Sequence, residues 1–342
     1  MGEGEAKKLG LRAVVYVKIF MFMKRFILIF PVVATFSLFN VSCQTIPPSE
    51  MSSEGEVVYE RLETELRIGL ALGSGGASGL AHIAVLEAFD ELGLTPHRIT
   101  GSSIGAVLGA LYASGMNARE IRKLVDDLVV QDTDTWREVL LDRQLLRWIQ
   151  FVDPDIGEGG LISGDAFISY LHEAIGVTNF EELAIPMKVV TADLWTREQV
   201  VIETGDLMSA VKASMAVPGL FAPVILEGQT LVDGGIVNPV PYDLLFEASD
   251  VVVAINVIGR NQPLDDLSLF RSMFLSMRVM QTAILREKLK VREPDIYIET
   301  GVEGVRLLEF NKIDEILRQA DPAKDRLKEA LREVIAGPAR GP

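Results

Sequence analysis

The sequence predicts an α/β domain built around a mainly parallel sheet with helices on both faces. Two features of the chain lead to this prediction. Short apolar runs that end at glycines indicate buried strands, and the first of them are followed at once by segments with helical spacing. Strands and helices that alternate at this spacing form βαβ units, whose strands are parallel and covered on both sides.

The elements can be assigned in chain order from these patterns. The first four are a strand over 67–72, a helix over 80–92, a strand that ends near Thr100 and a helix over 104–113. Further strands are expected at 187–192, 200–203, 230–232, 251–256 and 296–299, and further helices at 118–129, 164–174, 206–214, 269–290 and 312–334. Residues 131–163 mix tryptophan and phenylalanine with charges and have no clean period, which indicates either a lid that faces substrate or a plain surface insertion.

The N-terminus has the features of a secretory signal. Lys24 and Arg25 precede an apolar run over 26–39, which is shorter than the ~20 residues that a bilayer span needs. Cys43 is the single cysteine of the chain, and its place at the end of this run resembles the lipid-modified cysteine of bacterial lipoproteins. We expect a lipoprotein of the cell envelope, held at a membrane outside the cytoplasm. An ordinary signal peptide of a secreted protein, an uncleaved anchor and an intracellular protein are the alternatives.

Composition divides the chain into four parts and limits its partners. The expected parts are a leader over 1–42, a flexible tether over 43–65, the folded domain over 66–335 and a tail over 336–342. Outside the leader, 27 basic and 46 acidic side chains give a net charge of −19. A body this acidic repels nucleic-acid phosphates, so no nucleic-acid partner is expected, and contact with a membrane has to come through the N-terminal anchor.

A serine motif follows the second expected strand. Gly101-Ser102-Ser103-Ile104-Gly105 has the pattern G-x-S-x-G between a strand and a helix, where a tight turn projects the serine hydroxyl above the sheet. Gly101 and Gly105 permit the strained backbone of such a turn. Ser103 is therefore the candidate nucleophile, and a purely structural turn is the alternative.

A glycine-rich segment, Gly73-Ser74-Gly75-Gly76-Ala77-Ser78-Gly79, lies between the first strand and its helix. Backbone amides in such a loop could stabilise the oxyanion of an acyl-transfer reaction. Nucleotide binding fits less well, because the spacing from Gly73 places Ser78 where the third glycine of a dinucleotide fold belongs. We expect no nucleotide partner.

Asp233-Gly234-Gly235 follows the strand expected at 230–232 and supplies a candidate base. A serine nucleophile needs a group that removes its proton. The chain has three histidines, at 82, 97 and 172. The order Ser, acid, His of an α/β-hydrolase triad would require His172 from the middle of an expected helix and an acid within 104–171, which is a poor fit. A dyad of Ser103 and Asp233 without histidine is the remaining solution.

Three ordered segments together resemble a known family. They are GLALGSGGASGLAHIAVLEAF, GSSIGAVLGALYASG and SMAVPGLFAPVILEGQTLVDGGIVNPVPYDLL. In order and spacing they are similar to bacterial patatin-like phospholipases, and the likeness extends from about Leu66 to Val334. The resemblance implies a three-layer α/β/α domain that hydrolyses acyl esters of lipids, as a phospholipase A or a lysophospholipase does. It implies Ser103 as nucleophile and Asp233 as general base, with Gly234 and Gly235 in support of its turn.

The resemblance also implies an oxyanion hole, and the chain departs from the family pattern at one position near it. The amides of Gly75, Gly76 and Ala77 would form the hole, and no metal or organic cofactor is implied. The family usually carries Arg or Lys just before the last glycine of this loop, where this chain has Ser78. A non-catalytic lipid-binding relative, prompted by Ser78, and an esterase or thioesterase on soluble acyl substrates are the alternative functions.

Overall fold

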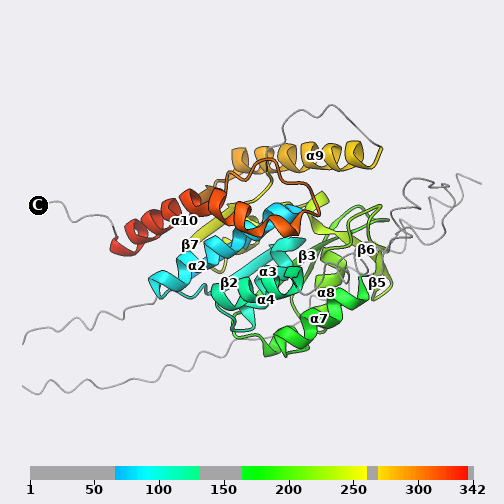
Figure 1. Cartoon of the computed structure of the whole chain (residues 1–342), viewed down its shortest axis with the longest axis horizontal. Coiled ribbons are helices and arrows are strands. Elements are labelled where there is room, and N and C mark those ends of the chain that lie inside the picture. The colour runs from blue at the N-terminus through cyan, green and yellow to red at the C-terminus, as the bar shows by residue number, and fades with distance from the viewer. Residues whose placement is uncertain (1–65, 131–163, 260–268, 338–342) are drawn as a thin grey trace, which may run out of the picture. The chain divides into compact units, whose positions relative to one another are not determined.

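The computed structural model describes residues 66–130, 164–259 and 269–337 of the chain, all within one compact unit (Figure 1). The expected leader, Cys43, the tether, the insertion over 131–163 and the last residues of the tail lie outside these ranges. Within the described ranges, no helix combines the length and the apolar character that crossing a bilayer requires.

An eight-stranded mixed sheet forms the centre of this unit, and most of its inner pairs are parallel. Its order is β5-β6-β3-β2-β1-β7-β8, and β4 pairs with β3 outside this path. β1 is parallel to β2 and β7, β2 to β3, and β7 to β8, whereas β4 and β6 run antiparallel to β3, and β5 antiparallel to β6. The strands are β1 (Ile68–Leu72), β2 (Arg98–Ser102), β3 (Met187–Asp193), β4 (Gln199–Ile202), β5 (Val224–Leu226), β6 (Gln229–Asp233), β7 (Val251–Asn256) and β8 (Ile296–Glu299).

The helices follow the sequence pattern closely. The described α-helices are α2 (His82–Leu92), α3 (Ile104–Ala113), α4 (Ala118–Val130), α7 (Asp165–Ile175), α8 (Leu207–Ser214), α9 (Leu269–Val291) and α10 (Ile313–Ala336). Short 3₁₀ segments are η1 (Gly76–Ala81), η2 (Phe180–Glu182), η3 (Gly234–Ile236), η4 (Tyr242–Leu245) and η5 (Phe310–Lys312). One strand, β5, was not expected from the sequence. It has only three residues, too few for a long apolar run, and none of them is fully buried.

Alternating side chains of the central strands bury both faces of the sheet. Leu70 and Leu72 of β1 belong to the large core formed with α2, α3 and α10, whereas Ala71 between them packs on the other face beside η4 and Leu285 of α9. β7 alternates in the same way, which is the two-residue period of a strand. Figure 1 shows α9 separated from α2 and α3 by the strands. The prediction of a mainly parallel sheet with helices on both faces is confirmed.

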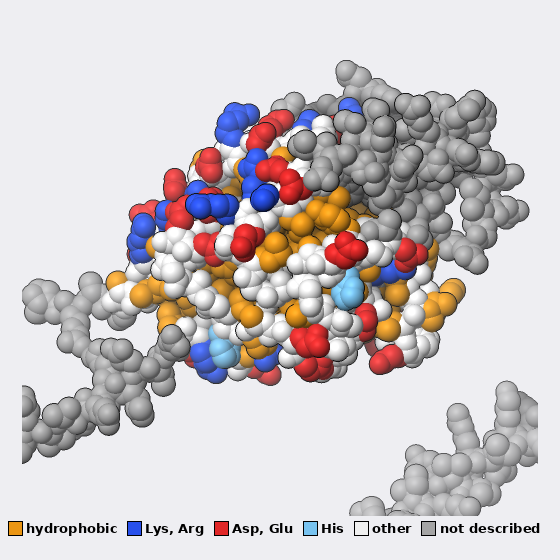
Figure 2. All heavy atoms as spheres, turned by 60° about the horizontal axis from the view of Figure 1, so that its bottom comes forward, with side chains coloured by type: hydrophobic (Ala, Val, Ile, Leu, Met, Phe, Trp, Pro, Cys, Tyr) orange, Lys and Arg blue, Asp and Glu red, His pale blue; other side chains and the backbone are white. Residues whose placement is uncertain are grey.

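The described surface carries mixed charges. Lys324 of α10 lies 3.0 Å from Glu87 and 3.4 Å from Glu91 of α2, and Lys328 also pairs with Glu91. On the face shown in Figure 2, acidic and basic side chains of the described residues are interspersed, and apolar side chains gather near the middle. Exposed ion pairs of this kind contribute little to stability, so the fold is stabilised mainly by its buried core.

Candidate active site

Ser103 occupies a strained turn between β2 and α3. Its φ of 55° and ψ of −125° place it in a backbone region that side chains other than glycine rarely adopt. A Cβ on Gly105 would lie 2.1 Å from the carbonyl oxygen of Leu72, and a Cβ on Gly101 would lie 2.6 Å from that of Gly105. Both positions therefore need glycine because the turn is packed against the backbone of β1 and α3. Ser103 is 7% exposed, and its side chain does not cap α3, so the hydroxyl is left for another partner.

The backbone of this turn is held by a second serine. The amide of Ser103 donates to the hydroxyl of Ser214 over 2.9 Å, and that hydroxyl donates to the carbonyl oxygen of Val190 in β3 over 2.7 Å. Ser214 ends α8 and is fully buried. Its hydroxyl therefore holds the backbone of Ser103 against the central strand β3. Sequence reasoning did not assign this role, although Ser214 is the first residue of the third family-like segment.

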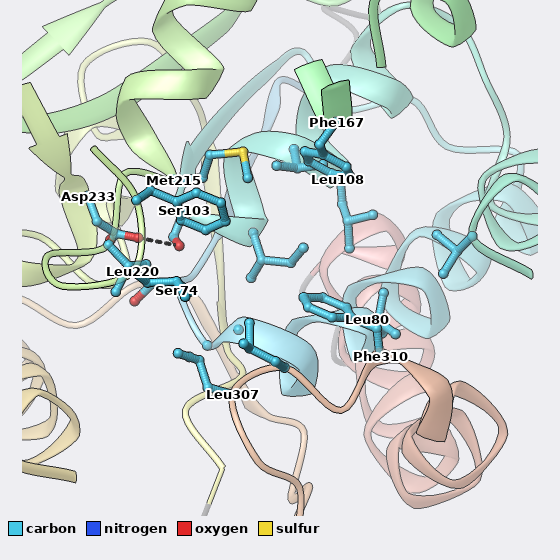
Figure 3. Close-up of a pocket in the computed structure, with 18 of the residues that line it drawn as sticks. Ser74, Leu80, Ser103, Leu108, Phe167, Met215, Leu220, Asp233, Leu307 and Phe310 are labelled. Carbon is cyan, nitrogen blue, oxygen red and sulfur yellow. Dashed lines mark hydrogen bonds between the residues drawn. The ribbon is translucent and has the colours of Figure 1, made fainter. Parts of the chain in front are cut away.

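The strand register places Asp233 level with Ser103. Ser102 pairs with Val190 of β3, and Asp233 pairs with the next residue of β3, Thr191. Ser103 directly follows Ser102, so the two site residues stand at the same level on either side of β3. Ser103 Oγ donates to Asp233 Oδ2 over 2.6 Å, and the two side chains point toward each other in Figure 3. The structure brings together the two residues that the sequence predicted as a dyad.

Two glycines after Asp233 fix the carboxylate. The amide of Gly235 donates to Asp233 Oδ1 over 2.7 Å, which leaves Oδ2 to accept from the serine. A Cβ on Gly234 would lie 2.1 Å from the carbonyl oxygen of Val190, so this turn also lies directly against β3. Side chains at either glycine would push the carboxylate away from its place.

Burial changes the acidity of Asp233. Its side chain is 1% exposed, and this burial raises its pKa from 3.8 to about 6, although the hydrogen bonds from Ser103 and Gly235 act in the opposite direction. The carboxylate is still mostly ionised at neutral pH, and it is a stronger base than an exposed aspartate. Such a pKa suits a group that takes up and returns a proton near pH 7.

The glycine-rich loop lies beside the dyad and is anchored by its own backbone. The Gly73 amide donates to the carbonyl of Ile255, and the Ala77 amide donates to the carbonyl of Leu307 over 2.8 Å. The Ala77 amide is therefore not available to an oxyanion, although the sequence predicted it as one of three amides in the hole. The amides of Gly75 and Gly76 have no acceptor in the described part of the chain.

The three histidines occupy positions that fit the absence of a triad. His82 is fully buried beneath the glycine-rich loop, and its Nε2 lies 2.8 Å from the carbonyl oxygen of Gly73. Burial lowers the pKa of His82 to about 4, so the ring is neutral at pH 7 and supports the loop as a hydrogen-bonding group. His97 and His172 are exposed, and neither lines the pocket beside Ser103.

A largely apolar pocket of about 100 Å³ opens beside the dyad (Figure 3). Its apolar wall comes from η1, α3, α4, α7, α9, the segment after α8 and the segment before α10. The labelled apolar side chains in Figure 3 are Leu80, Leu108, Phe167, Met215, Leu220, Leu307 and Phe310. Ser103 and Asp233 lie at one end of this wall. A hydrocarbon chain bound along it would place its carboxyl end at the serine hydroxyl.

Comparison with known sequences assigns the family. The sequence model described as patatin-like phospholipase matches residues 70–246, which are just over half of the chain and include the glycine-rich loop, Ser103 and Asp233. The chain belongs to the patatin-like phospholipase family. Its patatin-like domain extends past the matched region, because β7, α9, β8 and α10 complete the same sheet and core.

Several relatives share this domain. An uncharacterised protein of the NTE family from Mycobacterium tuberculosis is 34% identical over 194 residues, which are 56% of this chain and 49% of that protein. The neuropathy target esterase of Drosophila melanogaster is 28% identical over 277 residues, 73% of this chain and 18% of the esterase. The chain thus spans half or less of the length of these curated relatives.

Among solved structures, VipD from Legionella pneumophila aligns with 78% of this chain and 67% of its own, with a TM-score of 0.44 and 16% sequence identity. The type III effector ExoU aligns with a TM-score of 0.40 and 15% identity over 78% of this chain and 54% of its own. Similarity at this level adds nothing to the family assignment, which rests on the sequence match and on the observed α/β fold.

The loop position at which the family pattern expects a basic residue does not line the pocket in this domain. Ser78 is fully buried, its hydroxyl has no hydrogen-bond partner among the described residues, and a Cβ on Gly259 would lie 3.1 Å from that hydroxyl. The side chain at 78 therefore contacts the segment after β7. Among the described residues, no group of three or more histidine, cysteine, aspartate and glutamate side chains is placed to hold a metal ion.

Proposed function

We propose that this protein is a serine acyl-ester hydrolase that acts on lipids, with Ser103 as nucleophile and Asp233 as general base. The observation that carries the proposal is the 2.6 Å hydrogen bond from Ser103 Oγ to Asp233 Oδ2 at the end of an apolar pocket. Membership of the patatin-like phospholipase family supports the same reaction class.

The reaction would proceed in two steps. As Ser103 Oγ bonds to the acyl carbon, its proton passes to Asp233 Oδ2, and the carbonyl oxygen becomes an oxyanion. The Gly75 and Gly76 amides and the N-terminal end of α3 would stabilise that charge. The carbon–oxygen bond to the alcohol then breaks, and Asp233 returns the proton to the leaving oxygen.

Water completes the cycle. Asp233 accepts a proton from a water molecule that attacks the acyl-serine ester, and the second tetrahedral intermediate collapses to a free fatty acid. Ser103 Oγ regains its proton from Asp233, so both side chains end in their starting states. A single carboxylate can serve both steps because its pKa lies close to the working pH.

Hydrolysis of a chromogenic medium-chain ester by the full chain in neutral detergent tests the proposal. Ser103→Ala and Asp233→Asn should each lose at least about 100-fold in kcat/KM, because each removes a group that the transition state requires. Asp321→Asn, an exposed carboxylate on α10, is the matched control and should retain wild-type activity. Activity of Ser103→Ala within a few-fold of wild type would exclude the dyad.

Two further readouts separate the alternative functions. A rise in rate when the ester passes from monomers to micelles supports a lipid substrate, whereas equal rates support an esterase or thioesterase on soluble acyl compounds. A wild-type protein that hydrolyses no ester but binds lipid vesicles would be a non-catalytic lipid-binding relative.

We also propose that the chain is a lipoprotein held at a membrane of the cell envelope through Cys43. The proposal rests on the signal-like segment and on the position of the cysteine at its end. Metabolic labelling with a fatty acid should mark the wild-type chain and leave Cys43→Ala unlabelled. Equal labelling of both would refute lipidation at this residue.

A further inference from the structure

Ser74 and Gln281 form a polar corner of the pocket beside the base. Ser74 is 1% and Gln281 is 4% exposed, and both line the pocket with the dyad. A Cβ on Gly235 would lie 2.7 Å from the hydroxyl oxygen of Ser74 and 2.7 Å from the amide nitrogen of Gln281, so the two polar atoms converge on one place. The amide of Gly235 donates to the carboxylate of Asp233, and this place therefore adjoins the base. Figure 3 shows Ser74 at the same end of the pocket as Ser103 and Asp233.

Neither group of the polar corner has a hydrogen-bond partner among the described residues. The Ser74 hydroxyl is buried and unpaired, and no described residue bonds to the side-chain amide of Gln281. Buried polar groups in folded proteins are almost always paired with the protein, with a ligand or with ordered water. Ordered water needs about two to four polar partners and room for one molecule. The polar corner and the carboxylate of Asp233 supply these partners, and the pocket of about 100 Å³ supplies the room.

We propose that Ser74 and Gln281 hold the water molecule that hydrolyses the acyl-serine ester. The amide N–H of Gln281 donates to the oxygen of this water, and the water donates one O–H to the Ser74 hydroxyl and the other to Asp233. One lone pair of the water oxygen is then left for the acyl carbon on Ser103. This inference rests on the proposed hydrolase function and names the residues that serve its second step.

The dyad geometry explains why the water acts only in the second step. Before acylation, Asp233 Oδ2 accepts the proton of Ser103 Oγ over 2.6 Å. Once Ser103 Oγ is esterified and the alcohol has left, this carboxylate oxygen can accept from water. As the water oxygen bonds to the acyl carbon, its proton passes to Asp233, and the bond between that carbon and Ser103 Oγ breaks. The proton then moves from Asp233 to Ser103 Oγ, and the products are a free fatty acid and the original serine.

The two residues of the polar corner come from distant parts of the chain. Ser74 belongs to the glycine-rich loop, whereas Gln281 belongs to α9, beyond the region 70–246 that matches the family model. Acylation uses Ser103, Asp233 and the loop amides, none of which lies on α9. Deacylation depends in addition on one hydroxyl and one side-chain amide. Loss of either group should therefore slow the second step and leave the first unchanged.

A nitrophenyl ester of a medium-chain acid, assayed with the full chain in neutral detergent, separates the two steps. Release of the phenol reports acylation, and every later turnover requires deacylation. Ser74→Ala and Gln281→Leu should each lower kcat and KM together by about tenfold, because the water loses one hydrogen bond. Their kcat/KM should stay within about twofold of wild type, because this ratio reports only the steps up to acylation. Thr282→Val, a polar-to-apolar change at the exposed neighbour of Gln281, should match wild type in all these values.

Two readouts distinguish slow deacylation from a damaged fold. Both variants should release a burst of about one phenol per protein before the slow steady state, and mass spectrometry of the intact protein should find the acyl group on Ser103. Hydroxylamine attacks an acyl-serine ester without the bound water and forms the hydroxamate and free Ser103. Its addition should restore the turnover of both variants to within about twofold of wild type. Gln281→Met, which keeps the length of the side chain, replaces the leucine variant if that variant does not fold.

Failure of the water site differs from failure of the hydrolase function. A fall in kcat/KM without a burst would show that the polar corner binds the substrate or the leaving alcohol, and it would overturn the water site. An unchanged kcat without accumulation of the acyl group on Ser103 would overturn it as well. If wild type releases no phenol and Ser103 is never acylated, the proposed hydrolase function fails, and the water site fails with it.

Discussion

Replacement of Asp233 by asparagine should abolish activity and, as the pH rises, increase the free energy of unfolding relative to wild type. The carboxylate is 1% exposed, and its pKa is about 6 in the folded protein against 3.8 ordinarily. Between these two values the folded state holds a proton that the unfolded state has released. The free energy of unfolding of wild type therefore falls as the pH rises from about 4 to about 6.

The size of the effect follows from the pKa difference. A gap between 3.8 and about 6 corresponds to about 3 kcal/mol, reached when the carboxylate is fully ionised. The asparagine side chain of the variant has nearly the same shape and no charge. The variant's free energy of unfolding therefore does not show this fall as the pH rises. The difference in unfolding free energy, variant minus wild type, should grow by about 3 kcal/mol between pH 4 and pH 7, while the variant loses at least about 100-fold in activity.

Urea titrations of both proteins at several pH values measure this difference. All other titrating groups are shared, so their contributions cancel in the comparison. Ser103→Ala serves as a control, because it removes activity and retains the buried carboxylate, and its pH slope should be at least as steep as that of wild type. Parallel pH profiles for wild type and Asp233→Asn would refute the raised pKa and, with it, the argument that burial tunes this base.

Three other predictions concern the framework of the site. Ser214→Ala leaves the buried amide of Ser103 without its acceptor, so kcat should fall about tenfold and unfolding free energy by roughly 1–3 kcal/mol; an unchanged kcat would contradict this role. Gly105→Ala places a methyl group 2.1 Å from the carbonyl oxygen of Leu72, and denaturant melts should show a loss above about 3 kcal/mol or no soluble protein. His82 has a pKa of about 4 in the fold and 6.5 ordinarily, so the unfolded state binds a proton first as the pH falls. Relative to His82→Gln, wild type should lose about 3 kcal/mol of unfolding free energy between pH 6.5 and pH 4, and equal acid profiles of the two proteins would count against burial of a neutral ring.

Much of the fold could be predicted from local sequence patterns. The strands of the parallel part are buried on both sides, so they appear as continuous apolar runs that end at glycines. β5 lacked this signal because it is a three-residue edge strand whose side chains are partly exposed, with Ile225 77% exposed. Such a strand forms because its backbone pairs with β6, and the sequence of β5 alone does not indicate that pairing.

The site could be predicted where a reactive side chain and the glycines that shape its turn lie next to each other in the sequence. Ser103 and Asp233 each stand at a strand end beside glycines, and those glycines proved to be required by contacts with Leu72 and Val190. The engagement of the Ala77 amide could not be predicted, because its acceptor is the carbonyl of a residue 230 positions away. The role of Ser214 was missed for the same reason, because it depends on contacts with Ser103 and Val190, which are distant in the sequence.

The mixed sheet also determines when this protein can act during its own synthesis. Ser103 and Asp233 are 130 residues apart, and they meet only after β6 has paired with β3. At translation rates of roughly 5–20 residues per second, about 7 to 26 seconds separate the emergence of the nucleophile from that of its base. Long-range pairings of this kind also form late in folding. A nascent chain with an exposed Ser103 therefore lacks the carboxylate of Asp233, and under the proposed function it hydrolyses no ester until the domain is complete.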